Sequence, residues 1–345
     1  MLARMQRNVA LGPFTTLGIG GPAKFFLKAR SADEVRESVE WAKSNSEPLL
    51  VLGGGSNVLI ADEGFDGLVL HLDLRGISAS DDGVLQAAAT EPWDRLVAMV
   101  VAKDWAGVEC LSGIPGSTGA TPMQNVGAYG QDVSETIIAV EVFDRSNGCI
   151  TSLSNAECQF EYRNSIFKKS ARERYVVLSV TFQLRPGDAP SLRYPELQKA
   201  IAKGSSLQEV RDTVIAIRRR KGMVIDPADP DTRSDGSFFM NPIVSREKLA
   251  SLGDLPHFPA GENIKLSAAW LIEHAGFEKG LVHGNVGISS KHTLAIINRG
   301  GGTAREVLEL VRKIQDGVRE KFGVELQPEP NFIGFDHRVA DRTPA

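Results

Sequence analysis

A glycine-rich stretch at residues 111–132 constrains the fold of this chain more than any other feature of the sequence. Its 22 positions hold five glycines and two prolines, with serine, threonine and asparagine side chains between them. Glycine tolerates positive φ and lets backbone N–H groups approach a ligand without an intervening Cβ atom. This composition favours a loop wrapped around a phosphate-bearing cofactor. A turn-rich surface loop without a ligand is the alternative that composition alone leaves open.

A second glycine run follows a short apolar segment near the N-terminus. Residues 48–52 predict a buried strand, which leads directly into Gly53-Gly-Gly-Ser-Asn57. The run matches neither the G-x-G-x-x-G pattern that opens a Rossmann helix nor the Gly-Lys-Ser/Thr of a P-loop. A dinucleotide held here would therefore not be bound in the Rossmann manner, and an ordinary tight turn is the alternative.

The bulk properties exclude several classes of function. A length of 345 residues predicts two or three domains. A formal net charge of −4 argues against nucleic acid as the main partner. The N-terminus lacks an apolar signal region and no apolar run of about 18 residues follows, so we expect a cytoplasmic protein without a membrane partner. The six histidines lack metal-ligand spacing, and three cysteines predict buried free thiols in a reducing compartment.

Apolar periodicity and capping residues predict an α+β chain. Three stretches begin with Ser or Thr followed three positions later by Glu, the pattern of a helix N-terminus. The predicted helices are one that follows Ser31 and places Val35, Val39 and Ala42 on one face, and 91–105, 206–221, 266–275 and 303–322. Residues 17–27 predict a turn that leads into a strand. The other predicted strands are 48–52, 58–60, 68–72, 84–88, 139–143, 175–182 and 294–297, with a hairpin turn at 146–148.

Four polar residues interrupt apolar or turn-like contexts and are candidates for chemistry: Arg163, Tyr194, Ser237 and Glu329. Each has a structural alternative, such as a surface ion pair for the arginine or a satisfied turn hydroxyl for the serine. The cations of residues 218–221 end a predicted helix, where positive charge is favourable for the helix itself. They are equally suited to an anionic ligand.

Six motifs occur in order along the chain. They are Leu52-Gly-Gly-Gly-Ser-Asn57, Gly113-Ile-Pro-Gly-Ser117, Gln124-Asn-Val-Gly-Ala-Tyr-Gly-Gln131, Tyr162-Arg-Asn-Ser165, Gly236-Ser-Phe-Phe-Met-Asn-Pro242 and Gln327-Pro-Glu329. Together they resemble the UDP-N-acetylenolpyruvoylglucosamine reductases (MurB), the flavoenzymes of peptidoglycan synthesis. The resemblance covers residues 9–335, and the tyrosine at position 194 is similar to that of the type I subclass.

The resemblance implies an FAD-binding module of the vanillyl-alcohol oxidase (PCMH) type in two subdomains, followed by an α+β substrate-binding domain. The expected boundaries are 1–65 and 66–190 for the FAD subdomains, with a C-terminal strand near 324–335 returning to the first. The substrate domain is expected at 200–325 and a disordered tail at 338–345. FAD should be non-covalent, NADPH the reductant and the chain a monomer.

The resemblance also assigns residues. It implies hydride transfer from flavin N5 to C3 of UDP-N-acetylglucosamine enolpyruvate and protonation of C2 by Ser237. Arg163 would hold the substrate carboxylate and Glu329 would assist in stabilising the enolate. The implied FAD-binding residues are Gly53, Gly54, Gly55, Ser56, Asn57, Gly113, Gly116, Ser117, Asn125, Gly127 and Gly130. The implied substrate-binding residues are Tyr194, Arg218, Lys221, Asn241 and His292.

Two departures from the family pattern lie near the expected substrate. Met240 stands where the family commonly has lysine, which removes a cation, and Pro330-Asn331 replaces Val-Arg. Two other classes of protein compete with this interpretation. An FAD-dependent oxidase of the same cofactor fold would need a substrate base and, usually, a covalent flavin, and neither signature is visible. A non-catalytic nucleotide-binding protein would lack flavin absorption near ~450 nm.

Overall fold

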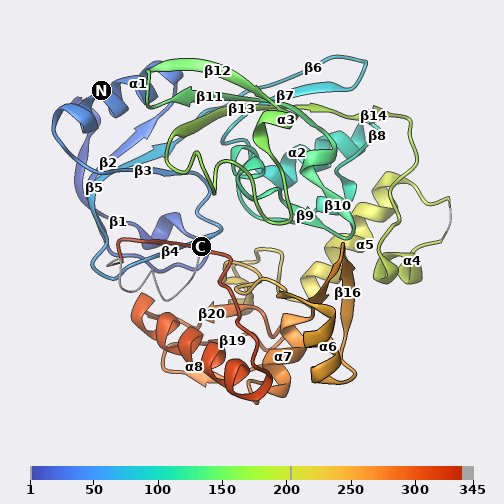
Figure 1. The fold of residues 1–345 in the computed structure, drawn as a ribbon. Helices are drawn as coiled ribbons and strands as arrows, with labels where there is room; N and C mark the ends of the chain where they lie inside the picture. Colours follow the sequence, from blue (N-terminus) through green and yellow to red (C-terminus); the bar gives the residue numbers. More distant parts are fainter. Residues whose placement is uncertain (1, 203, 336–345) are drawn as a thin grey trace. The chain divides into compact units, whose positions relative to one another are not determined.

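The computed structural model describes residues 2–202 and 204–335 (Figure 1). The tail predicted to be disordered, 338–345, lies outside these residues. The chain forms two compact units, each built from separated segments. Unit 1 comprises residues up to Val9, Ala23–Gly54 and Asp66–Arg220, and unit 2 comprises Ala10–Pro22, Gly55–Phe65 and the chain from Lys221 onward. The boundary between the units divides the 53–57 glycine run after Gly54.

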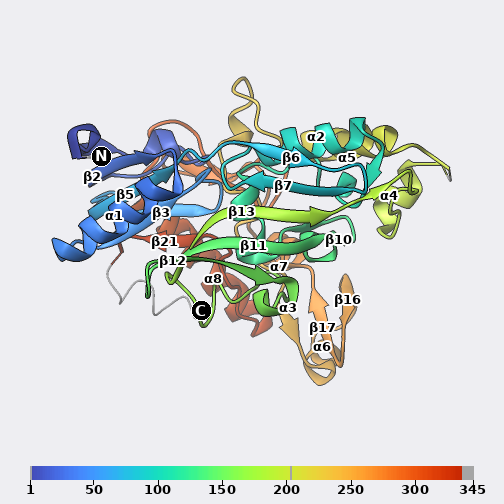
Figure 2. The same cartoon turned by 90° about the horizontal axis from the view of Figure 1, so that it is seen from above.

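Unit 1 contains two sheets. The first has the order β1-β2-β5-β3, with β3 and β5 parallel, and the second is antiparallel with the order β12-β11-β13-β7-β6 (Figure 2). Residues 146–148 close the β11–β12 hairpin, as the sequence predicts. The strands of the first sheet are β1 (Gln6–Ala10), β2 (Pro22–Ala29), β3 (Leu49–Leu52) and β5 (Phe65–Leu72). Those of the second are β6 (Ile77–Ala79), β7 (Val84–Ala88), β11 (Ile137–Asp144), β12 (Cys149–Ser154) and β13 (Tyr175–Gln183).

The helices of unit 1 bury the apolar faces that their periodicity predicts. In α1 the buried side chains include Val35 and Val39, and in α2 they include Leu96 and Val100. Both helices contribute to one core with the two sheets, and α2 lies beside α5. The helices are α1 (Ala32–Ser44), α2 (Trp93–Ala102), α3 (Asn155–Cys158), α4 (Pro195–Ala200) and α5 (Leu207–Arg220). Two-stranded pairs are β8 (Trp105–Ala106) with β14 (Arg185–Pro186) and β9 (Gly127–Ala128) with β10 (Gln131–Asp132).

Unit 2 is built from short strands and three helices. Its sheets have the orders β15-β17-β16 and β18-β19-β20, and β21 pairs in parallel with β4. The strands are β4 (Val58–Ile60), β15 (Ile243–Val244), β16 (His257–Ala260), β17 (Asn263–Leu266), β18 (Val282–His283), β19 (Val286–Ile288), β20 (Ile296–Asn298) and β21 (Asn331–Ile333). The helices are α6 (Arg246–Leu252), α7 (Ala268–His274) and α8 (Ala304–Phe322).

Helix α8 supplies the largest apolar face of unit 2. Its buried side chains include Val307, Leu310, Ile314 and Val318, and the helix packs against α7 and β19 (Figure 1). The predicted capping box is present, because Thr303 and Glu306 exchange hydrogen bonds at the first turn. The core of unit 2 also takes in the segments that hold the candidate polar residues: Phe238 and Phe239 are both buried there.

The structure corrects several details of the sequence prediction. The helix predicted from residue 91 begins at Trp93, because Pro92 sits at its N-cap position. Leu266, predicted to begin a helix, ends strand β17 instead. Cys149 is exposed on the edge strand β12, so the expectation of three buried thiols was wrong for this one; Cys110 and Cys158 are buried. Within residues 2–202 and 204–335, no helix is long and apolar enough to cross a membrane.

Candidate active site

The two glycine runs predicted as ligand loops meet in unit 1. A Cβ atom on Gly54 would lie 3.0 Å from the Cα atom of Gly116, and one on Gly53 would lie 3.0 Å from the Ser117 hydroxyl. Real Cβ atoms rarely pack this closely against backbone, so glycine at these positions lets the loops touch. Loops far apart in the sequence thus form one cradle of exposed backbone, the kind of surface that binds phosphate groups.

Helix α2 fixes the second loop of this cradle. The Trp93 N–H donates to Gly116 O at 3.1 Å, and the Gly113 N–H donates to the Asp94 carboxylate at 2.6 Å. Asp94 also accepts two bonds, at 2.6 and 2.9 Å, from the Arg211 guanidinium of α5. Partial burial acts to raise the pKa of Asp94, but the bonds from Arg211 and Gly113 outweigh it and lower the pKa. A charged pair therefore holds the loop to two helices.

Asn125 and Gly127 hold the turn that carries Arg163. The Asn125 amide donates to Glu161 O at 3.1 Å, and the Arg163 guanidinium donates to Gly127 O at 2.6 Å. A Cβ on Gly127 would lie 1.6 Å from the Asp132 carboxylate, so a side chain there would displace the Asp132 side chain. Arg163 itself has φ +54°, an uncommon backbone conformation for a residue with a side chain. The turn thus depends on contacts from the loop at residues 125–127.

Two tyrosines and a second arginine gather beside this turn. The rings of Tyr129 and Tyr194 meet edge to face with centroids 5.6 Å apart. Tyr129 also hydrogen-bonds Arg218 of α5, whose charge interacts with that of Arg163. Burial raises the pKa of Tyr129 to about 12, with Arg218 opposing the shift, and burial lowers the pKa of Arg218. Unit 1 therefore places two guanidinium groups next to two phenols, which suits an anionic ligand.

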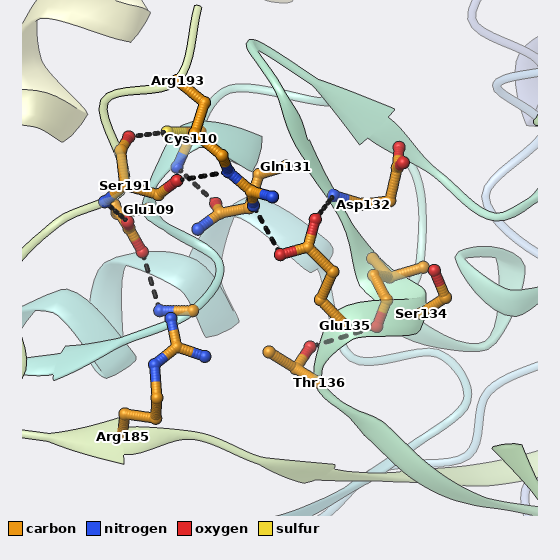
Figure 3. Close-up of polar contacts among 12 residues, drawn as sticks. Glu109, Cys110, Gln131, Asp132, Ser134, Glu135, Thr136, Arg185, Ser191 and Arg193 are labelled. Atoms are coloured by element: carbon orange, nitrogen blue, oxygen red, sulfur yellow. Dashed lines mark hydrogen bonds and ion pairs between the residues drawn. The ribbon is translucent and has the colours of Figure 1, made fainter. Parts of the chain in front are cut away.

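A polar network fixes the segment that leads to Tyr194 (Figure 3). The buried carboxylate of Glu109 accepts from the Ser191 N–H at 2.8 Å, and the Cys110 thiol donates to Ser191 O at 3.2 Å. Arg193, the next residue but one, forms an ion pair with Glu135. A Cβ atom on Gly130 would lie 3.2 Å from the Cβ atom of Arg193. Residues just before and just after the glycine-rich loop thus hold the segment that leads to Tyr194.

The second half of the 53–57 run lies in unit 2 beside the segment that carries Glu329. The Asn57 amide donates to Glu329 O at 3.5 Å, and the Asn331 N–H donates to Asn57 O at 3.0 Å. Gly55 O accepts from the Thr16 N–H at 2.9 Å. Ser56, between Gly55 and Asn57 in the sequence, is half-buried. A predicted cofactor loop and a predicted catalytic carboxylate are therefore joined through backbone contacts.

Ser237 lies on the strand-like segment next to Glu329. The Glu329 N–H donates to Phe238 O at 2.8 Å, and the Met240 N–H donates to Gln327 O at 2.9 Å. Both Ser237 and Glu329 are half-buried, at positions a ligand could reach. The structure thus brings these two predicted catalytic residues together in unit 2, whereas Arg163 belongs to unit 1.

The remaining predicted substrate residues lie near this segment or at its ends. Asn241 accepts the Ala268 N–H at 2.9 Å, at the first turn of α7. His292 accepts the Leu294 N–H at 3.0 Å through Nδ1, and Leu294 O in turn accepts from Phe238 N–H at 2.7 Å. Lys221 follows the last residue of α5 and is half-buried.

Comparisons with known proteins identify two family domains in this chain. Residues 23–154 match the family model of an FAD binding domain, and residues 227–333 match that of the UDP-N-acetylenolpyruvoylglucosamine reductase C-terminal domain. The two glycine loops that meet in unit 1 both lie inside the range matched by the FAD binding domain. The chain is therefore an FAD-dependent oxidoreductase.

Relatives extend the match to the whole chain. UDP-N-acetylenolpyruvoylglucosamine reductases of Thermobifida fusca and Streptomyces coelicolor are 48% and 49% identical to it. These alignments cover 97% and 95% of this chain and 99% and 90% of the relatives. The crystal structure of the Thermus caldophilus reductase (MurB) is 27% identical, with a TM-score of 0.68 over 95% of this chain and 99% of that one. The chain belongs to the UDP-N-acetylenolpyruvoylglucosamine reductase family, as its motifs predict.

Sequence reasoning missed three residues of the candidate site. Tyr129 and Arg211 make contacts with residues 65 or more positions away in the chain. Asp235 is buried beside the Ser237 turn. The one signal available was the acidic residue in Ser234-Asp-Gly-Ser-Phe-Phe239, a charge placed directly before two core phenylalanines.

Proposed function

We propose that this chain reduces the enolpyruvyl ether of UDP-N-acetylglucosamine, with Arg163, Ser237 and Glu329 as its catalytic residues. Bound FAD supplies the redox chemistry, carrying a hydride from NADPH to the enolpyruvyl double bond. One observation carries the residue assignment: Ser237 and Glu329 lie on hydrogen-bonded neighbouring segments, and Glu329 also contacts Asn57 of the cofactor loop. These contacts relate the acid and carboxylate to the loop that would hold the flavin.

Arg163 is suited to the substrate carboxylate. A guanidinium presents a planar pair of N–H donors that matches a carboxylate in two-point fashion. As negative charge develops over C2 and the carboxylate, a fixed positive group stabilises it without reorganisation. Glu329 takes part in the same stabilisation. The Gly127 and Asn125 contacts hold the Arg163 turn in its unusual backbone conformation, so the donor is preorganised.

Ser237 delivers the proton that completes the addition at C2. A serine hydroxyl is a weak acid, and it can serve only because the carbanion is strongly basic and the donor is held in place. Placement comes from the bonds of the next residue: Phe238 donates to Leu294 O and accepts from the Glu329 N–H. Tyr194, Arg218 and Lys221 would bind the diphosphate and uridine groups, with Asn241 and His292 also on the substrate side.

Two half-reactions test this function. The purified protein is reduced anaerobically with NADPH, and UDP-N-acetylglucosamine enolpyruvate is then added while flavin absorbance near ~450 nm is followed. We expect bleaching in the first step and rapid return of absorbance in the second. Flavin that stays reduced after addition of this substrate would contradict the proposed activity. The variant Arg163→Lys should slow the second step much more than the first.

The roles of the chain segments are also proposals. We infer that residues 1–65 and 66–190 hold FAD, while residues 200–325 bind the nucleotide sugar. Hydrogen exchange with and without FAD tests the assignment, and we expect protection at residues 53–57 and 113–130. We further infer a cytoplasmic monomer. The net charge of −4 supports the inference that it does not act on nucleic acid. Light scattering at working concentration tests the monomer, and a dimer mass would contradict it.

A further inference from the structure

Asp235 is a buried acidic residue to which none of the roles above applies. Its exposed fraction is 8%, and it lies two residues before Ser237. The Oδ1 atom is 3.1 Å from the Thr16 hydroxyl, 219 positions away in the chain. Among the described residues, the buried Oδ2 atom has no hydrogen-bond partner. A carboxylate in this position would be a desolvated charge with one of its two oxygens unsatisfied.

The surroundings of Asp235 favour its neutral form. Burial raises the pKa of Asp235 to about 8, and the Thr16 hydroxyl opposes the shift only in part. No charged side chain of the described residues contributes to this shift. Thr16, on one side, and the Ser234–Gly236 turn, on the other, offer hydroxyl and backbone groups and no cation. Near neutral pH the group is therefore a carboxylic acid that can donate a hydrogen bond.

The Thr16 hydroxyl links Asp235 to the cofactor loop. It lies 3.5 Å from Gly55 O, which also accepts the Thr16 N–H at 2.9 Å. A hydroxyl has one proton to donate. When Asp235 is neutral it can donate to the Thr16 oxygen, and the Thr16 proton is then available to Gly55 O. When Asp235 is ionised it can only accept, so it takes the Thr16 proton away from Gly55.

The same residue belongs to the turn that presents Ser237. The Gly236 N–H donates to the Ser234 hydroxyl at 3.2 Å, and Gly236 has φ +75°. Ser237 follows directly, and Phe238 then enters the core. Any shift of the Asp235 side chain is passed to Ser237 through two peptide units of this tight turn. Asp235 thus has the Ser237 turn on its backbone side and the Thr16–Gly55 contact on its side-chain side.

We propose that Asp235 is a positioning residue that must stay protonated to hold the Ser237 turn against Thr16 and Gly55 of the FAD loop. The inference rests on the proposed roles of Ser237 and Gly55. It adds a second acid that does not touch the substrate and that sets an alkaline limit on the reaction. Ionisation of Asp235 weakens both the placement of the proton donor and the hold on the cofactor loop.

Asp235→Asn and Asp235→Ala separate this role from simple packing. An amide can donate to the Thr16 oxygen as the neutral acid does, whereas alanine cannot. In the flavin reoxidation step at pH 7, we expect Asp235→Ala to lose about tenfold or more and Asp235→Asn to recover most of that loss. Above pH 8 the wild-type rate should fall and the Asp235→Asn rate should not. Asp254→Asn removes an exposed acid of the same unit and should keep the wild-type pH profile.

A binding measurement keeps the inference testable if the reaction itself fails. The dissociation constant of FAD is followed by fluorescence between pH 6 and 10 for the wild type, Asp235→Asn and Thr16→Val. We expect wild-type affinity to weaken severalfold above pH 8, Asp235→Asn to show no such change, and Thr16→Val to be weak at every pH. Identical alkaline limbs for the wild type and Asp235→Asn, in rate and in FAD affinity, would overturn the proposal. If the wild type does not turn over the substrate but its FAD affinity still weakens above pH 8, the result would count against the proposed reaction alone.

Discussion

The two units hold an acidic side chain in opposite ways, one of them partly exposed and the other buried. In unit 1, Asp94 is kept charged by a two-point bond to Arg211 and a bond from the Gly113 N–H, and its pKa is lowered. In unit 2, Asp235 has a threonine hydroxyl instead of a cation, and burial raises its pKa to about 8. Charge fixes the cofactor loop in unit 1, whereas neutrality lets the Ser237 turn pack in unit 2. The pKa of an aspartate is therefore shifted in opposite directions in the two units, according to the partners of its carboxyl group.

The largest expected effect is on the rate of flavin reoxidation when the proposed proton donor is removed and the flavin-binding loops are left intact. Ser237→Ala should slow flavin reoxidation by the enolpyruvyl substrate by about 10³-fold, because it removes the hydroxyl proposed to protonate C2. Flavin reduction by NADPH should remain near the wild-type rate, since the cradle of unit 1 is untouched. Stopped-flow absorbance measures both steps on one sample. Wild-type reoxidation by this variant would remove Ser237 from the mechanism.

The pKa shifts of Asp235 and Asp94 predict opposite pH dependences of the free energy of unfolding. Asp235 has a folded pKa above its unfolded value, so the unfolded state loses its proton first and stability falls as pH rises from about 4 to about 8. The slope from this group is about 1.4 kcal/mol per pH unit. Asp94 has a lowered folded pKa, so its contribution is present above the unfolded pKa and is lost as pH falls.

Urea unfolding between pH 3 and 9 measures both contributions. Asp235→Asn should flatten the fall in the free energy of unfolding between pH 4 and 8, and it should leave the change below pH 4 as in the wild type. Asp94→Asn should cost about 2 kcal/mol at pH 7, because it leaves the nearly buried Arg211 without its partner, and should flatten the acid side. A fall in the free energy of unfolding between pH 4 and 8 that persists in Asp235→Asn would show that another group titrates there.

Local pattern was enough to predict most of the fold. The stripes of α1, α2, α5 and α8 are buried as their 3.6-residue period predicts, because helix periodicity is written in consecutive residues. The first and last residues of elements were less predictable, as at Leu266, which pairs with His257 in a sheet instead of starting a helix. Cys149 was misjudged because its exposure depends on β12 being an edge strand, and strand order is not visible in a local window.

The candidate site was readable only where a motif carries it. Gly53, Gly116 and Ser237 lie in such motifs. A Cβ atom on Gly53 would lie 3.0 Å from the Ser117 hydroxyl, and Gly116 has φ +112°. The meaning of Arg211 and Asp235 comes from single contacts with Asp94 and Thr16, 117 and 219 positions away. From local sequence alone, a charged residue in a helix or a turn is most simply placed on the solvated surface. Its partner far away in the chain becomes visible only in the folded structure.

A smaller effect is expected where the two glycine loops touch. Gly54→Ala places a Cβ 3.0 Å from the backbone of Gly116, so the loops must separate by a few tenths of an ångström. We expect FAD affinity to fall about tenfold, equivalent to about 1.4 kcal/mol, with little change in the protein's unfolding transition. Fluorescence titration of FAD measures the affinity.

Gly148→Ala is the matched control for this substitution. Gly148 has φ +74° in the β11–β12 turn, and an added Cβ would meet nothing within 4 Å. This variant carries backbone strain without loop contact, so it should bind FAD as the wild type does. Equal losses of FAD affinity in both variants would show that general destabilisation, and not the loop crossing, is responsible.

The smallest expected effect concerns Met240, which stands where the family commonly has lysine. Met240 is half-buried beside Gln327, and its side chain offers no charge to a diphosphate. Met240→Lys should lower the KM for the nucleotide-sugar substrate about threefold at low salt, because a partly exposed cation adds less than about 1 kcal/mol. The gain should fade as ionic strength rises, since screening acts over about 8 Å at 0.15 M. Met240→Gln adds polarity without charge and should leave KM and its salt dependence unchanged. A gain with Met240→Lys that persists at high salt would point to a change of packing in unit 2 instead of an added phosphate contact.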